Sequence, residues 1–244
     1  MVLQVSEIEP ALAGSSPSSA PGPDMIPNSV CKRINKVASN LILDLLTPLL
    51  CHGFHPPSLT STDGIVLDKP GKPSYDFLSS FSIIVLLQTL SKILERIMNS
   101  HLSGVAQLMG LLNPHQSGSL AGLSVTDVCN TLTHEITTLQ MDKRMVSTLF
   151  LDIKGGFDNI NPTTLCRMLS AKGVNQYLVS WTQFFLTGRS CHLLFERSRK
   201  VFAPGSVGTP QGSPVSFLLF SISVSRLFHE IPYGLTFSYV DDFA

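Results

Sequence analysis

The chain has few charged residues and no excess of either sign. Asp, Glu, Lys and Arg make up 14% of its 244 residues, and 17 basic residues balance 17 acidic ones. About a quarter is usual for a soluble domain. A protein that binds polynucleotides normally carries a basic surplus, because its cations replace the counterions around the phosphates. The composition therefore argues against strong nucleic-acid binding by this chain alone.

Cysteines and long apolar segments are also scarce. The five cysteines form no CxxC pair and no Cys/His cluster with the spacing of a zinc site, which favours buried thiols in a reducing compartment. We therefore expect an intracellular protein, and the sequence does not distinguish nucleus from cytoplasm. No apolar run reaches transmembrane length and no signal-peptide pattern opens the chain, so we expect no membrane contact. The longest apolar stretches, residues 77–90 and 215–228, are interpreted as buried helices.

Local patterns predict a mixture of helices and strands, that is, an α+β fold. Helical spacing of apolar residues predicts helices over residues 28–51 and 86–102, while Asn161-Pro162 and the capping pair Ser124 and Asp127 mark two further helix starts. Residues 1–23, rich in Ala, Ser, Gly and Pro, are expected to be flexible. Short apolar or alternating runs predict strands at residues 64–68, 146–153 and 235–240, and a hairpin over residues 191–203.

Three aspartates stand out because each follows an apolar strand. Asp152 ends the run at 146–153, and Asp241 and Asp242 follow the run at 235–240. A carboxylate at the end of a buried strand is costly unless it is paired, protonated or bound to a cation. We expect the two strands to pair antiparallel, with Asp241 facing Asp152 and Asp242 pointing the other way. Such carboxylates suit two-metal phosphoryl transfer with Mg²⁺, although any one of them alone is more often a turn or cap residue.

The motifs around these aspartates resemble the successive palm motifs of reverse transcriptases, in order. They are Leu-Asp-Ile-Lys-Gly-Gly-Phe-Asp (151–158), Gly-Thr-Pro-Gln-Gly-Ser-Pro (208–214) and Tyr-Val-Asp-Asp (239–242). Further segments make the chain similar to the reverse transcriptases of non-LTR, LINE-like retrotransposons: Ala-Pro-Gly-Pro-Asp-Met-Ile-Pro (20–27), Lys-Pro-Gly-Lys (69–72), Leu-Ser-Lys-Ile-Leu-Glu-Arg (90–96) and the stretch from Trp181 to Arg189. The three palm motifs together are specific, whereas Asp-Asp alone is weak.

The resemblance implies a right-hand polymerase with fingers and palm, in which helices flank an antiparallel palm sheet. Residues 1–23 would be the flexible N-terminal segment, residues 24–145 the fingers-like region and residues 146–244 the palm-like region. The implied activity is RNA-directed DNA polymerisation. The implied partners are an RNA template, a DNA primer and deoxynucleoside triphosphates, with two Mg²⁺ ions, or Mn²⁺ in their place.

The resemblance also assigns roles to individual residues. Asp152 and Asp241 are the implied principal metal ligands and catalytic residues, with Asp242 supporting them. Phe157 matches the bulky residue that blocks a 2′-hydroxyl, although a core aromatic is the alternative. The remaining implied nucleotide contacts are Gln211, Gly212, Lys69 and Lys72. For the two lysines, an exposed basic turn is an equally good interpretation.

The chain departs from the family pattern at functional positions. Ser82 stands where the family has an arginine on the triphosphate, and Leu120 and Leu123 replace two further arginines. The sequence stops two residues after Asp242, so we expect the return strand of the catalytic hairpin, the primer grip and the thumb to be absent. The expected outcome is a polymerase fragment that is inactive as this chain, or a non-catalytic retroelement remnant or nucleic-acid-binding module.

Overall fold

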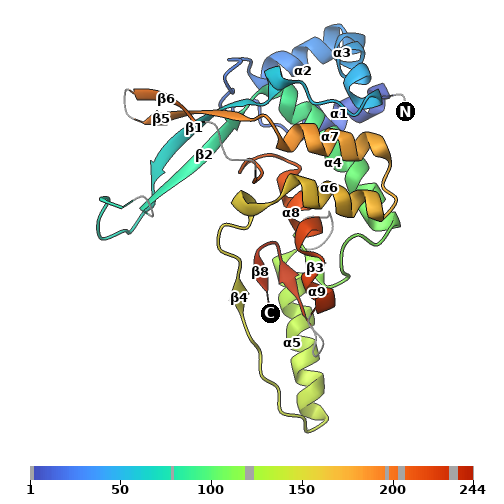
Figure 1. Ribbon diagram of the computed structural model, residues 1–244, viewed down its shortest axis with the longest axis vertical. Coiled ribbons are helices and arrows are strands. Elements are labelled where there is room, and N and C mark those ends of the chain that lie inside the picture. The colour runs from blue at the N-terminus through green and yellow to red at the C-terminus, as the bar shows by residue number, and fades with distance from the viewer. Residues whose placement is uncertain are drawn as a thin grey trace.

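Helices and two four-stranded sheets make up the computed structural model, which describes residues 3–77, 80–118, 124–195, 198–202, 207–230 and 236–243 (Figure 1). The helices are α1 (Val5–Ala13), α2 (Asn28–Val37), α3 (Ser39–Cys51), α4 (Thr89–Leu108), α5 (Val125–Met141), α6 (Pro162–Ala171), α7 (Gln176–Leu186), α8 (Ser216–Val224) and α9 (Leu227–Glu230), with 3-10 turns at Pro57–Leu59 and Phe157–Asn159. The strands are β1 (Ser61–Asp68), β2 (Phe81–Leu87), β3 (Gln116–Ser117), β4 (Leu151–Asp152), β5 (Ser190–Phe195), β6 (Ser198–Phe202), β7 (Ser238–Tyr239) and β8 (Asp242–Phe243). The predicted α+β class is confirmed.

The first sheet has the order β2-β1-β5-β6 and projects from the helical body (Figure 1). β1 pairs antiparallel with β2 and parallel with β5, while β5 and β6 form the predicted hairpin. Gly64 in β1 has no room for a side chain, because a Cβ there would lie 2.9 Å from Cys191 Sγ. The predicted helix over residues 77–90 is wrong, since residues 81–87 form β2. Its run of β-branched residues suits a strand that pairs with β1 along its length.

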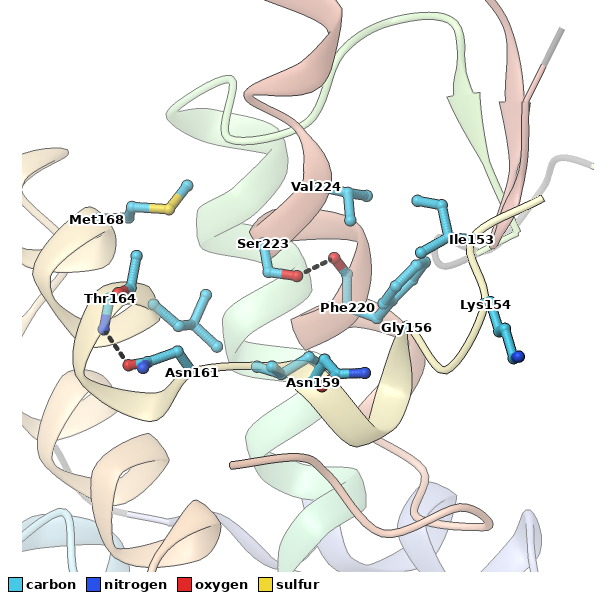
Figure 2. Close-up of a pocket in the computed structure, with 12 residues that line it drawn as sticks. Ile153, Lys154, Gly156, Asn159, Asn161, Thr164, Met168, Phe220, Ser223 and Val224 are labelled. Carbon is cyan, nitrogen blue, oxygen red and sulfur yellow. Dashed lines mark hydrogen bonds between the residues drawn. The ribbon is translucent and has the colours of Figure 1, made fainter. Parts of the chain in front are cut away.

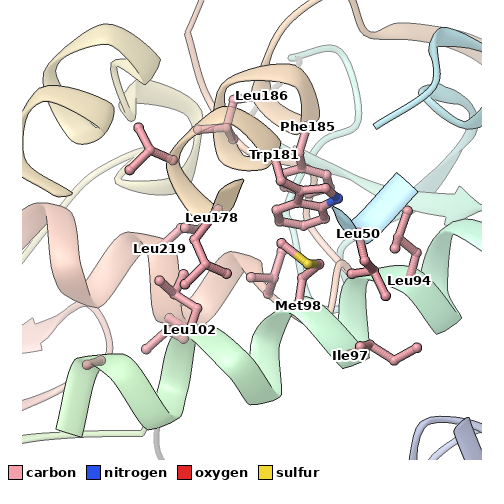
Figure 3. Packing of buried hydrophobic residues seen from close by; sticks show 14 of the residues in the cluster. Leu50, Leu94, Ile97, Met98, Leu102, Leu178, Trp181, Phe185, Leu186 and Leu219 are labelled. Carbon is pink, nitrogen blue, oxygen red and sulfur yellow. The ribbon is translucent and has the colours of Figure 1, made fainter. Parts of the chain in front are cut away.

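The main core surrounds α4, which runs through the middle of the helical body. Trp181 and Phe185 of α7 stack with centroids 5.0 Å apart, and Figure 3 shows them above Leu94 and Met98 of α4. The predicted helix over residues 86–102 is confirmed, although α4 begins at Thr89. The predicted burial of the apolar helix after Val215 is also confirmed, because six residues of α8 are buried, namely Ser216, Leu218, Leu219, Phe220, Ser221 and Ile222.

The N-terminal segment is partly helical, so the prediction that residues 1–23 are flexible is wrong for α1. Ile8 and Leu12 of α1 are buried, and Arg96 of α4 donates from Nη1 to the Ala11 carbonyl and to Ser15 Oγ. The predicted helix over residues 28–51 is broken at Ala38 into α2 and α3, which meet at 109°. No single helix among the described residues is long and apolar enough to cross a membrane. The pair α2 and α3 is long and apolar enough only when its two helices are counted together.

The second sheet has the order β3-β7-β8-β4 and consists of two-residue strands. The predicted buried strand over residues 146–153 is wrong, because only Leu151–Asp152 forms a strand and both residues are exposed. Leu149 and Phe150 before it are 70% and 71% exposed. None of the residues of α5 is buried, and this helix extends beside the exposed segment (Figure 1). β3 comes from the predicted fingers-like region yet pairs with β7, so that region contributes to the palm-like sheet.

Candidate active site

The aspartates of β4 and β8 meet in a short antiparallel arrangement. β7 and β8 form a hairpin in which Tyr239 lies opposite Asp242. β8 also pairs antiparallel with β4, which places Asp152 opposite Asp242. The Ile153 amide donates to the Asp241 carbonyl at 3.3 Å. Asp152 and Asp242 are therefore cross-strand neighbours, and such neighbours have Cβ atoms roughly 5 Å apart.

This register differs from the sequence-based expectation in two ways. The expected direct partner of Asp152 was Asp241, whereas the structure pairs it with Asp242. A return strand was expected to be absent, whereas β8 is a two-residue return strand, and it lies between β4 and β7. Both differences have one cause: the chain turns at Val240 and Asp241 instead of staying extended through Asp242.

The turn depends on an unusual backbone conformation at Val240. Its φ is +56°, a region that β-branched residues rarely adopt. The Val240 amide donates to the Ser117 carbonyl at 3.1 Å, and its side chain is 7% exposed. Gly118 makes room for it, because a Cβ on Gly118 would lie 2.6 Å from Val240 Cγ2. The sequence analysis did not predict this role of Ser117 and Gly118. The available signal was Gly118 itself, because glycine often marks a position where another segment approaches the backbone closely.

The carboxylates lie at the surface of this sheet. Asp152 and Asp242 are exposed and Asp241 is half-buried. Within the described ranges, no three His, Cys, Asp or Glu side chains gather closely enough to hold a metal ion by themselves. Mg²⁺ is usually bound through one or two carboxylates, with waters and substrate phosphates completing its shell. The pair of Asp152 and Asp242 therefore has the donor chemistry for such an ion when a phosphate substrate supplies further oxygens.

Phe157 follows the first aspartate on a 3-10 turn and packs against α8. Its ring stacks on Phe220, with centroids 4.8 Å apart and planes at 23°, and meets Phe217 edge-on at 5.3 Å. The side chain is half-buried. Phe157 thus packs against the core as a partly buried aromatic residue, and part of its ring stays exposed.

A cavity of about 310 Å³ lies beside this turn, between the turn, α6 and α8 (Figure 2). Apolar side chains dominate its lining, among them Ile153, Met168, Phe220 and Val224, and polar groups come from Asn159 and Asn161. The Asn161 side chain is occupied in capping α6, since its Oδ1 accepts from the Thr164 amide at 3.0 Å. None of the three aspartates lines this cavity, although Ile153, which follows Asp152 directly, does.

The loop at residues 208–214 lies between the palm-like and fingers-like parts. The Gly208 and Thr209 amides donate to the Ile160 and Phe157 carbonyls at 2.7 and 2.8 Å. On its other side, a Cβ on Gly212 would lie 3.3 Å from the Val85 carbonyl of β2. Gln211 and Gly212 are exposed at the tip, and the φ of +103° at Gly212 favours glycine. The structure thus attaches the start of the loop to the turn that carries Phe157 and places Gly212 beside β2.

The two lysines do not join this group. Lys69 and Lys72 lie on the connection between β1 and β2, which is apart from the aspartate hairpin in Figure 1. The Lys69 amide donates to the Ser80 carbonyl at 2.8 Å, and Lys72 is exposed. Ser82 lies in β2 opposite Leu67. Leu120 and Leu123 lie outside the described residues.

Comparison with known proteins decides the family. The family model described as reverse transcriptase (RNA-dependent DNA polymerase) matches residues 67–244, well over half of the chain. The chain belongs to the reverse transcriptase family. Members of this family use divalent metal ions, in agreement with carboxylates as the candidate ligands.

The relatives of this reverse transcriptase domain come from non-LTR retrotransposons, as the motifs predicted. It is 25% identical over 216 residues to the probable RNA-directed DNA polymerase from transposon X-element of Drosophila melanogaster, covering 88% of this chain and 24% of that protein. It is 24% identical over 224 residues to the RNA-directed DNA polymerase from mobile element jockey of the same species, covering 91% and 24%. The domain therefore spans about a quarter of the length of these relatives.

A solved structure of apo telomerase from Candida tropicalis, truncated from its C-terminal domain, is also similar to this domain. The two are 16% identical with a TM-score of 0.49, and the match covers 89% of this chain and 48% of the telomerase chain.

Proposed function

We propose that this domain provides the fingers and palm of an RNA-directed DNA polymerase that extends a DNA primer on an RNA template. The observation that carries the proposal is the pairing of Asp152 with Asp242 across β4 and β8, with Asp241 at the adjoining turn. Two strands far apart in the sequence thereby deliver carboxylates to one edge. Family membership supports nucleotidyl transfer over other uses of such a carboxylate pair.

In this proposal the three aspartates hold two divalent cations, Mg²⁺ or Mn²⁺, together with the triphosphate of an incoming deoxynucleotide. When bound there, such cations would lower the pKa of the primer 3′-hydroxyl and stabilise the charge on the leaving pyrophosphate. Asp152 and Asp242 hold the cations from neighbouring strands, and Asp241 contributes from the turn. Phe157 lies under the sugar, and the exposed tip at Gln211 and Gly212 packs against the base pair. Lys69 and Lys72 contact phosphates only if the β1–β2 hairpin folds toward the site.

We also propose that the 244-residue chain alone does not extend primers measurably. Ser82 occupies the position of a triphosphate-binding arginine, and Leu120 and Leu123 replace two further arginines. Each lost charge-assisted hydrogen bond costs about 1.5–3 kcal/mol, and phosphoryl transfer depends almost wholly on positioning and charge stabilisation. The balance of 17 basic and 17 acidic residues points the same way. A non-catalytic retroelement remnant is the second candidate, favoured by these same substitutions.

The test is a primer-extension assay on an RNA template with Mg²⁺ or Mn²⁺. It compares the unaltered chain, the triple variant S82R/L120R/L123R, and the triple variant fused to the C-terminal remainder of the jockey relative. Each protein is also prepared with Asp152→Ala to detect contaminating polymerase. We expect templated synthesis only after the arginines and the fused segment are supplied, and we expect Asp152→Ala to abolish it. Synthesis by the unaltered chain that Asp152→Ala abolishes would refute its inactivity. No synthesis by the fused triple variant, shown to be folded, would favour the non-catalytic remnant.

A further inference from the structure

A glutamate is completely buried where α4 meets the loop at residues 208–214. Glu95 is 0% exposed, and each of its two carboxylate oxygens accepts a hydrogen bond. Ser91 Oγ donates to Oε1 at 2.6 Å, and Ser213 Oγ donates to Oε2 at the same distance. A buried carboxylate is costly unless hydrogen bonds and a countercharge compensate it, so both donors matter to this group.

Three cations lie near enough to attract Glu95, namely Lys92, Arg96 and Arg189, and the most deeply placed is Arg189, just before β5. Its Nη1 donates to the Phe185 carbonyl at 3.0 Å, and its Cζ lies 4.9 Å from the centre of the Phe185 ring. Among the described residues, the buried Nη2 atom has no hydrogen-bond partner. Burial lowers the pKa of Arg189, and the attraction of Glu95 opposes that change. Arg189 thus supplies positive charge near Glu95 without forming a direct bond to it.

His55 fills the remaining side of the junction as a neutral ring. Its Nε2 lies 3.4 Å from Ser91 Oγ, and its ring meets Trp181 and Phe185 edge-on at 5.6 and 5.5 Å. Burial, and then the charge of Arg189, lowers the pKa of His55 to about 3. The imidazole therefore adds no charge near neutral pH and does not compete with Arg189 for Glu95.

Three separate sequence motifs converge on this junction. Ser91 and Glu95 belong to Leu-Ser-Lys-Ile-Leu-Glu-Arg (90–96), and Ser213 belongs to Gly-Thr-Pro-Gln-Gly-Ser-Pro (208–214). The third motif, Trp181 to Arg189, supplies the countercharge and the aromatic wall. We propose that Glu95 is a positioning residue which, through Ser213, fixes the loop that faces the incoming nucleotide. This inference rests on the proposed function, because that function gives the loop its ligand.

The loop is held at both ends, and Glu95 supplies one of them. At the other end, the Gly208 and Thr209 amides bind the turn that carries Phe157. The exposed tip at Gln211 and Gly212 lies between these two attachments. Ser213 Oγ also accepts from the Val215 amide at 3.3 Å, which ties the same hydroxyl to the start of α8. Removing the Glu95–Ser213 bond leaves the tip attached to the palm-like part but not to α4.

The experiment measures amide hydrogen exchange of residues 208–214 by mass spectrometry in Ser213→Ala, Glu95→Gln and the double variant. Each change has a matched control. Ser221→Ala removes another fully buried hydroxyl, which has no hydrogen-bond partner in the described part of the chain. Glu9→Gln makes the same charge change at an exposed position. We expect each single variant to speed exchange in the loop by about tenfold to a hundredfold, as for loss of one charge-assisted hydrogen bond. We expect the double variant to be no faster than the larger single effect, because both changes act on the bond between Glu95 and Ser213.

A second readout separates positioning from general stability. Mg²⁺–dATP binding is measured by equilibrium dialysis in the S82R/L120R/L123R chain, to which each variant is added, at a temperature where every protein is folded. Ile97→Val, a mild core change in α4, serves as the reference for unspecific destabilisation. We expect Ser213→Ala and Glu95→Gln to weaken dATP binding about tenfold and Ile97→Val to leave it unchanged.

The two readouts keep the inference and the proposed function distinguishable. Loop exchange in Ser213→Ala equal to that in Ser221→Ala overturns the role of Glu95. Equal loss of dATP binding in Ser213→Ala and Ile97→Val overturns it as well. An S82R/L120R/L123R chain that binds no dATP contradicts the proposed function, while faster loop exchange in that case still supports the attachment of the loop by Glu95.

Discussion

Acidification is expected to destabilise the domain through His55. The ring is 1% exposed, and it is enclosed by Trp181, Phe185 and Ser91. Burial, with a further contribution from Arg189, lowers the pKa of His55 from 6.5 to about 3. The other charged group at this junction is Glu95, which binds Ser91 rather than the ring. The folded state therefore keeps His55 neutral at a pH where the unfolded chain protonates it.

The sign and size of the effect follow from proton linkage. Between about pH 6.5 and 3, the unfolded state binds more protons at this position, so the free energy of unfolding falls as the pH falls. Each pH unit in that window removes about 1.4 kcal/mol, which gives about 3 kcal/mol between pH 7 and about pH 4.5. Above the ordinary pKa the contribution is fully present. Natural domains are stable by only about 5–15 kcal/mol, so the loss is a large fraction of the total.

The assay is urea denaturation of the unaltered chain and of His55→Phe at several pH values between about 7 and 4.5. Phenylalanine keeps an aromatic ring against Trp181 and Phe185 but cannot titrate. Other groups, such as Glu7, titrate alike in both proteins, so the difference between the two pH profiles isolates His55. We expect the unaltered chain to lose about 3 kcal/mol more than His55→Phe. The exposed His134→Phe serves as the control and is expected to follow the unaltered chain. Parallel profiles for His55→Phe and the unaltered chain would refute the reasoning.

Two further predictions concern packing and capping. Gly156→Ala is expected to lower the free energy of unfolding by about 1–3 kcal/mol, because the new Cβ would lie 2.5 Å from Phe220 Cε2. Gly104→Ala, at an open position in α4, is expected to raise the free energy of unfolding by no more than about 1 kcal/mol. Equal urea midpoints for the two variants would contradict this account of the Phe220 contact. Ser124→Ala is expected to destabilise α5 by about 1 kcal/mol and to speed amide exchange within that helix alone, because Ser124 and Asp127 form a capping box and α5 has no buried residue. Unchanged exchange in α5 would show that the cap contributes nothing there.

Helix ends and all-apolar helices could be predicted because their signals are local. Asn161 followed by Pro162 predicted the start of α6, and Asn161 caps that helix in the structure. Ser124 and Asp127 form the predicted capping box at α5. The uninterrupted apolar pattern after Val215 predicted a buried helix, since no polar stripe remained to face solvent. Each of these signals lies within a few residues of the structure that it predicts.

Apolar runs whose structure depends on distant partners were predicted less well. Residues 81–87 look like part of a helix by hydropathy alone, and only the pairing with β1 makes them a strand. A short apolar run does not by itself distinguish a buried strand from a helix or from an exposed segment. The run at residues 146–150 failed for this reason, because its apolar character says nothing about which element covers it. Phe150 is 71% exposed in the structure.

The candidate site was predicted by residue type but not by geometry. Motif order identified Asp152, Asp241 and Asp242, yet their register depends on a turn at Val240, where a β-branched residue gives no signal for a positive φ. The bond between Glu95 and Ser213 joins residues 118 positions apart. No spacing rule links residues that distant, so only the fold reveals their contact.

Divalent cation binding tests the central claim most directly. Mn²⁺ binding is followed by electron paramagnetic resonance, with and without dATP, in the unaltered chain, Asp152→Asn, Asp242→Asn and the exposed control Asp44→Asn. If Asp152 and Asp242 hold the cation as cross-strand neighbours, dATP will strengthen Mn²⁺ binding in the unaltered chain and in Asp44→Asn. Either site variant will then weaken that binding about tenfold or more, as expected for loss of one charged ligand. Equal Mn²⁺ binding in all four proteins would contradict the assignment of the paired aspartates as the metal site.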